Sequence, residues 1–224
     1  MERNNFLKIY LPLFFVIIFS FFLLGAKVDK FVKKIQKRYD KIENFVADFS
    51  QENYIKSMER RSHFYGKVYF SNDNKIRWDY LKPTKDQFIS NGKKVWYYNE
   101  KERQVFVGRT SRFFGSNVAF LFLTGMKKIR DIFNIEEEKS SPLSKELLKL
   151  KLIPKKKDQR INFIIADVDK QTFLINRLEI HDNMDNLIIV KFFNIKLNVP
   201  LPNDLFVFQA PEGVEIIEFG LQRR

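Results

Sequence analysis

The sequence of 224 residues contains no cysteine and only two histidines, His63 and His181. The missing cysteine excludes disulfides, thiolate metal sites, cysteine nucleophiles and lipid anchors attached through a cysteine. His63 is expected just before a strand and His181 at a strand end, so an ordinary surface role suits both. The common nucleophile, phosphate-loop, dinucleotide and zinc motifs are also absent. We therefore expect no catalytic residue, no metal and no cofactor, and a protein that is not an enzyme.

Acidic residues are in the minority, with 27 Asp and Glu against 40 Lys and Arg, which gives a net charge of +13. The chain is nevertheless 45% hydrophobic and carries 25 Phe, so it is too apolar for a disordered basic tail. A basic and strongly aromatic protein suits one of three partners: nucleic acid, an anionic membrane surface, or a hydrophobic ligand.

Residues 1–26 have the layout of a secretory signal peptide. Arg3 and Lys8 precede an uncharged apolar run, and Gly25 and Ala26 are small residues just before Lys27. We predict cleavage after Ala26, which leaves a single domain of residues 27–224 outside the cytoplasm. The alternative is an uncleaved inner-membrane anchor, because residues 9–26 approach the minimum length of a membrane-spanning helix. Either outcome exports the remaining chain and argues against nucleic acid as a partner.

The exported part begins with a predicted amphipathic helix and continues as strands. Apolar residues from Val28 to Val46 recur at spacings of three and four, opposite a row of lysines. This pattern fits a helix on a membrane surface or, more simply, a helix packed on its own sheet. From about Phe45 the apolar period changes to two, as in strands. Asn91-Gly92 and Asp182-Asn183 are typical of turns between strands.

Short strands joined by turns predict an antiparallel sheet. We expect strands near residues 67–70, 75–80, 88–89, 95–98, 103–107, 147–153, 161–168, 173–180, 187–195, 206–208 and 214–217. Residues 113–125 suit a short buried helix, residues 136–142 a loop, and residues 149–157 a solvated hairpin. Few helices are available to cover so large a sheet. Its aromatic rows therefore fit either a sealed core or an open apolar cavity for an acyl chain.

Four motifs in order resemble the LolA family of periplasmic outer-membrane lipoprotein carriers. They are Phe45-x-Ala47-x-Phe49-x-Gln51 after the helix, Gly66-x-Val68-x-Phe70 followed by Arg77-Trp78-Asp79-Tyr80-x-x-Pro83, the segment 89–98 around Asn91-Gly92, and Asp204-x-Phe206-x-Phe208-x-x-Pro211-x-Gly213-Val214. The resemblance extends over residues 31–218, nearly the whole exported chain. It implies a mainly β (α+β) fold, in which a curved antiparallel sheet forms an incomplete β-barrel closed by a few α-helices.

The resemblance also implies the partners. A carrier of this kind binds the acyl chains of lipoproteins, receives them from an inner-membrane ABC-type lipoprotein transporter and delivers them to the outer membrane or a receptor there. It acts as a monomer. The related receptor, LolB, shares the fold but is itself a lipoprotein, so the missing cysteine favours the carrier.

The motifs assign roles to individual residues of this sequence. The acyl cavity would be lined by Phe49, Val68, Phe70, Ile76, Trp78, Tyr80, Phe120 and Leu123. The family usually has Arg-Pro just after the Gly-x-Val-x-Phe strand, and that arginine contacts the lid. Here the two positions are Asn72 and Asp73, and Asn72 would contact the lid with a shorter, uncharged side chain.

Two other functions remain open at this point. The first keeps the fold but binds an envelope lipid or glycolipid, and its leader would serve as a membrane tether. The second is an envelope hydrolase that uses a pair of carboxylates, although no spacing of acidic residues nominates a pair.

Overall fold

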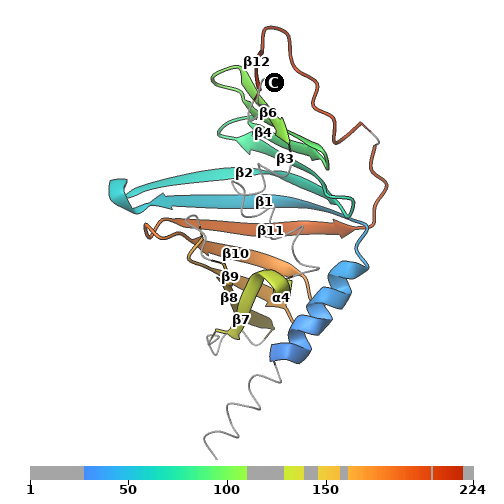
Figure 1. Cartoon of the computed structure of the whole chain (residues 1–224), viewed down its shortest axis with the longest axis vertical. Helices are drawn as coiled ribbons and strands as arrows, with labels where there is room; N and C mark the ends of the chain where they lie inside the picture. Colours follow the sequence, from blue (N-terminus) through green and yellow to red (C-terminus); the bar gives the residue numbers. More distant parts are fainter. Residues whose placement is uncertain (1–27, 110–128, 139–145, 157–160, 203, 219–224) are drawn as a thin grey trace, which may run out of the picture.

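The computed structural model describes residues 28–109, 129–138, 146–156, 161–202 and 204–218. In this part a helix over residues 28–40, the N-terminal helix, packs beside one curved sheet of 12 strands (Figure 1). The strands are β1 (Asn44–Ile55), β2 (Arg60–Ser71), β3 (Lys75–Lys82), β4 (Gln87–Asn91), β5 (Lys94–Asn99), β6 (Gln104–Arg109), β7 (Phe133–Glu137), β8 (Leu147–Pro154), β9 (Phe163–Asp169), β10 (Ile175–His181), β11 (Leu187–Leu197) and β12 (Glu215–Glu218). The short elements η1 (Lys56–Met58) and α4 (Ile129–Ile132) complete the description.

The sheet is open. Its strand order is β12-β6-β5-β4-β3-β2-β1-β11-β10-β9-β8-β7, so β12 and β7 lie at its two ends. Neighbouring strands are antiparallel except β6 and β12, which are parallel. The predicted incomplete barrel of mainly β structure is therefore confirmed, whereas the expectation of a purely antiparallel sheet is wrong at that one pair.

Alternation along the strands gives the sheet an apolar inner face and a polar outer face. We define the inner face by the side chains that join the N-terminal helix in one hydrophobic cluster. On β1 these are Phe45, Ala47 and Phe49, all of them buried. Asp48 lies between them on the outer face and is paired with Lys67 at 3.5 Å.

The N-terminal helix closes one end of the sheet. Val32, Ile35 and Tyr39 are buried against the strands, while the lysines opposite them remain exposed. The hydroxyl of Tyr39 accepts a hydrogen bond of 3.2 Å from the backbone N–H of Ile175, at the start of β10. Burial raises the pKa of Tyr39 to about 12, so this hydroxyl stays neutral. The apolar stripe of the helix is thus used inside the protein itself.

Both predicted turns are confirmed. Gly92 takes a φ of +87°, and the side chain of Asn91 accepts hydrogen bonds from the backbone N–H groups of Lys93 and Lys94 at 3.0 and 2.8 Å. In the second turn, Asp182 accepts hydrogen bonds from the backbone of Met184 and Asn186, each at 2.8 Å. These side chains replace the ladder hydrogen bonds that the turning backbone cannot make.

Three local predictions are wrong. The loop expected at residues 136–142 begins inside β7, where Phe133 and Ile135 join the hydrophobic cluster and Asn134 and Glu136 are exposed. The hairpin expected at residues 149–157 is instead β8 as far as Pro154, with Leu150 and Leu152 buried. Residues 206–208 form a turn and a bend, not a strand, although the side chain of Phe206 is buried.

Two other boundaries move. The N-terminal helix ends at residue 40, and the apolar residues that continue its pattern are buried from other backbone: Ile42 from the turn after the helix and Phe45 from β1. His63 lies within β2, not before it. The short helix expected at residues 113–125 falls outside the described residues.

Gly66 leaves no room for a side chain on the inner face. It lies opposite Phe49 in the β1–β2 ladder and opposite Tyr80 in the β2–β3 ladder. A methyl group at Gly66 would overlap the carbonyl oxygen of Asp79 and come within 2.6 Å of the Phe49 ring. The missing side chain therefore lets the ring of Phe49 lie across β2.

We predict that Gly66→Ala lowers the free energy of unfolding by about 2–3 kcal/mol, because backbone or ring must shift to admit the methyl group. Urea unfolding followed by circular dichroism would measure the change. Ser62→Ala, on the same face of β2, is the control and should change stability little. Equal stability of Gly66→Ala and the parent protein would contradict the close approach.

Candidate functional site

The residues predicted for the acyl site come together on the inner face, as far as the structure describes them. Phe49, Val68, Phe70, Ile76 and Trp78 are buried, and Tyr80 is partly buried and packs against them; they come from the neighbouring strands β1, β2 and β3. Phe120 and Leu123 lie outside the described residues. The six described residues form one surface.

Aromatic rings form the centre of this surface. The ring of Phe49 lies 4.4 Å from Trp78 and 5.4 Å from Tyr80, measured between centroids. Trp78 also meets Phe192 of β11 edge to face at 6.1 Å. Aromatic pairs of this kind add roughly 0.5–1.5 kcal/mol each beyond the area that they bury. We call Phe49, Trp78, Tyr80 and Phe192 the aromatic cluster.

Sequence reasoning missed the half of the inner face that β7–β11 contribute. Phe192 and Val190 of β11 lie opposite Phe49 and Gln51 of β1, so they extend the same surface. Further inner side chains follow on the next strands: Leu148, Leu150, Leu152, Ile164, Ala166, Val168, Leu178 and Ile180. Apolar residues do alternate along β8 and β10, and this pattern marks their inner side chains. The family motifs lie in other parts of the sequence, so they point to none of these residues.

Along β1 the inner face becomes polar toward the end of the sheet that lies away from the N-terminal helix, while the facing positions of β11 stay apolar. After Phe49, the next inner positions of β1 are Gln51 and Asn53, which are partly exposed. The hydroxyl of Tyr80 donates a hydrogen bond of 3.1 Å to Gln51, whose amide nitrogen donates one of 2.9 Å to Asn53. Burial raises the pKa of Tyr80, against the smaller opposite effect of its bond to Gln51. The phenol is therefore a neutral donor.

Asn72, the residue at the position of the family arginine, is exposed in the turn between β2 and β3. The interaction described for it is a backbone one, in which its N–H donates to the carbonyl oxygen of Glu43 at 2.9 Å. This bond joins the turn to the residue just before β1. The proposed contact of its side chain with a lid stays a prediction, since residues 110–128 are not described.

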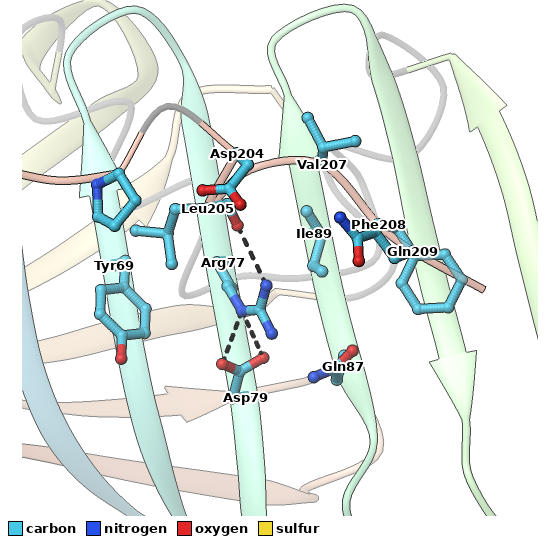
Figure 2. Close-up of a pocket in the computed structure, with 11 residues that line it drawn as sticks. Tyr69, Arg77, Asp79, Gln87, Ile89, Asp204, Leu205, Val207, Phe208 and Gln209 are labelled. Atoms are coloured by element: carbon cyan, nitrogen blue, oxygen red, sulfur yellow. Dashed lines mark hydrogen bonds and ion pairs between the residues drawn. The ribbon is translucent and has the colours of Figure 1, made fainter. Parts of the chain in front are cut away.

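The outer face carries a groove of about 460 Å³ where the C-terminal segment crosses β2–β4 (Figure 2). Arg77 Nε donates to both carboxylate oxygens of Asp79, at 3.0 and 2.7 Å, and Arg77 also donates to the carbonyl oxygen of Leu205 at 3.2 Å. The ring of Phe208 lies 5.6 Å from that of Tyr98. Arg77 thus ties the C-terminal segment to the sheet, and its charge is neutralised by Asp79.

Charged pairs cover the outer face of β8–β10. Asp167 is buried between Lys149 at 3.4 Å and Arg177 at 3.5 Å, and Arg177 also pairs with Glu179. His181 approaches the same Glu179 at 3.5 Å. These groups neutralise one another across neighbouring strands. Within the described ranges, no three His, Asp or Glu side chains gather where they could hold a metal ion.

The part of the chain that the structure describes holds no helix with both the length and the apolar character needed to cross a membrane.

Comparisons with known proteins agree with this picture. Residues 40–209 match the family model described as outer membrane lipoprotein carrier protein LolA. Two proteins named outer-membrane lipoprotein carrier protein are similar over most of their length. The one from Methylococcus capsulatus is 29% identical over 83% of this chain and 86% of its own, and the one from Nitrosomonas europaea is 32% identical over 92% and 98%. A crystal structure of an uncharacterised conserved protein from Thermus thermophilus is similar in fold, with a TM-score of 0.55 at 13% identity over 86% of this chain and 99% of that one.

The raised pKa of Asp79 gives a testable pH dependence. Desolvation raises this pKa above its ordinary value of 3.8, and the Arg77 guanidinium only partly offsets the shift. The folded state therefore holds the proton more tightly than the unfolded state. As the pH rises from the ordinary value through the raised pKa, the contribution of Asp79 to the free energy of unfolding falls.

We predict that Asp79→Asn, which cannot titrate, gains stability relative to the parent protein over that pH range. Urea unfolding of both proteins at pH 4–7 would measure the difference between their free energies of unfolding. The titration of the other carboxylates contributes equally to both proteins and cancels in this difference. A difference that is flat with pH, or that moves the opposite way, would contradict the assignment.

Proposed function

Because the chain belongs to the LolA family of outer-membrane lipoprotein carrier proteins, we propose that it carries the acyl chains of lipoproteins through the periplasm toward the outer membrane. The observation that carries this proposal is the inner face of the sheet. It is a continuous apolar surface with the aromatic cluster at its centre, and one end of it is closed by the N-terminal helix.

The energetics of such a surface suit an acyl chain. Each CH₂ group removed from water contributes roughly 0.8 kcal/mol, so a free lipid anchor does not leave a membrane for water unescorted. Rings and branched aliphatic side chains from both halves of the sheet offer the replacement surface. The polar outer face keeps the loaded protein hydrated.

Loading requires the inner face to open. Phe49 and Trp78 are no more than 1% exposed, and they pack against other side chains of the same cluster. An acyl chain must therefore displace contacts that the protein makes with itself. This property suits a carrier, since regained internal contacts offset part of the cost of releasing the cargo. We propose Phe49, Val68, Phe70, Ile76, Trp78 and Tyr80 as lining residues, together with Phe120, Leu123 and a lid contact of Asn72.

The remaining assignments follow from the same role. We propose that residues 1–26 direct export and are removed after Ala26, that residues 27–224 act as one monomeric domain, and that the protein is not an enzyme. An inner-membrane ABC-type transporter would supply the cargo, and the outer membrane or a receptor there would accept it. An uncleaved leader would instead give a tethered lipid-binding protein of the same fold, and N-terminal sequencing of the exported protein separates the two forms.

We predict that depletion of the protein in its native cells causes lipoproteins to accumulate at the inner membrane, because their acyl chains have no apolar surface to transfer to. Membrane fractionation and immunoblotting of lipoproteins would measure this distribution. An unchanged distribution after depletion would contradict the carrier function.

A matched pair of variants links that phenotype to the inner face. Phe49→Asp should fail to restore transport, because it places a charge at the centre of the aromatic cluster. His63→Ala, on the exposed outer side of β2, should restore it fully. Circular dichroism of both purified variants checks that each is folded. If a folded Phe49→Asp variant restored transport, the inner face would not be the binding surface.

A further inference from the structure

One buried donor on the inner face makes no hydrogen bond of ordinary geometry. The indole Nε1 of Trp78 is buried, since Trp78 is only 1% exposed, and it makes no hydrogen bond. Its interaction with the nearby Tyr80 hydroxyl is weak and lacks the geometry of a hydrogen bond. A buried donor left unpaired costs about 1–3 kcal/mol, so proteins rarely keep one without a use for it.

The position of this N–H divides the inner face into two regions. Toward the N-terminal helix, the next inner residue of β3 is Ile76, which is opposite Phe70 of β2 and is fully buried. Toward the opposite end lie Tyr80 and then Gln51, whose hydrogen bond opens the polar region. On β3 and the nearby part of β1, Trp78 therefore stands between apolar side chains and the polar groups of Tyr80 and Gln51.

An acyl group has the complementary chemistry. Its hydrocarbon chain is apolar, and the carbonyl group through which it is attached accepts hydrogen bonds but donates none. The indole N–H donates and cannot accept. A chain that lies along Ile76 and Phe70 toward the N-terminal helix would bring its carbonyl to Trp78 and its polar attachment to Gln51 and Asn53.

We propose that the Trp78 indole N–H donates a hydrogen bond to the carbonyl oxygen of a bound acyl group and so fixes the depth and direction of the chain. Tyr80, Gln51 and Asn53 hold the polar attachment of the chain at the more exposed end. This inference rests on the proposed carrier function. It adds that the site recognises an ester or amide carbonyl as well as hydrocarbon.

Binding of two matched probes tests the proposal. The first is a synthetic lipopeptide whose cysteine carries two ester-linked palmitoyl chains, and the second is its dialkyl ether analogue with the same chain length. The parent protein should bind the ester probe roughly three- to tenfold more tightly, which corresponds to one neutral hydrogen bond. Trp78→Phe should remove this preference, so that the variant binds the two probes with equal affinity.

The chain offers a matched control, because it contains only two tryptophans. Trp96 follows Val95 on β5 and lies on the opposite face of the sheet from that buried residue. Trp96→Phe should keep the preference for the ester probe. The proposal is overturned if the preference survives in Trp78→Phe or if Trp96→Phe removes it.

A second measurement uses only the parent protein, so its outcome does not depend on whether a variant folds. In the ¹H–¹⁵N spectrum of the parent protein, the ester probe should shift the indole resonance of Trp78 downfield and the ether probe should not, while the Trp96 resonance stays in place. Equal affinity for the two probes with an unmoved Trp78 resonance overturns the hydrogen bond and leaves the carrier function standing. If neither probe binds, the carrier function fails, and the inference fails with it.

Discussion

The separation of one continuous sheet into an apolar face and a charged face is the constraint on which the rest of the structure depends. Along β1 the buried Phe45, Ala47 and Phe49 alternate with half-buried residues, and each neighbouring strand must keep its register to extend that surface. Shifting one strand by a single residue would place charges in the core. The open barrel, the position of the N-terminal helix and the candidate site all follow from this segregation.

The sequence predicts those parts of the fold in which a local pattern is unambiguous. Ile76, Trp78 and Tyr80 alternate with charged residues, so β3 and its inner side are predicted directly. The prediction misses β7 because it is a short end strand, where the consecutive residues Glu136 and Glu137 resemble a loop by composition. The residues around Phe206 resemble a strand in the sequence because they include apolar residues at a spacing of two. Phe206 is instead a turn residue whose side chain is buried.

The candidate site shows a different limit. Motifs nominate Phe49 and Trp78, but Phe192 reaches them through pairing of β1 with β11, between segments far apart in the chain. No local pattern encodes that pairing. The unpaired N–H of Trp78 is likewise a property of the folded surroundings, since the sequence shows a tryptophan without showing which of its atoms lack partners. Sequence supplies the hydrophobic surface, and only the structure locates its polar contact.

The pairing of β1 with β11 also sets the order in which the protein can be completed. Because a chain is synthesised from its amino end, β1 to β6 are made long before β11, so half of the apolar surface lacks its neighbouring strand until β11 is made. Closing such a distant contact is slow, and the waiting strands are prone to aggregate. Until β11 pairs with β1, the protein therefore exposes an apolar surface of the same kind as the acyl chains that it carries.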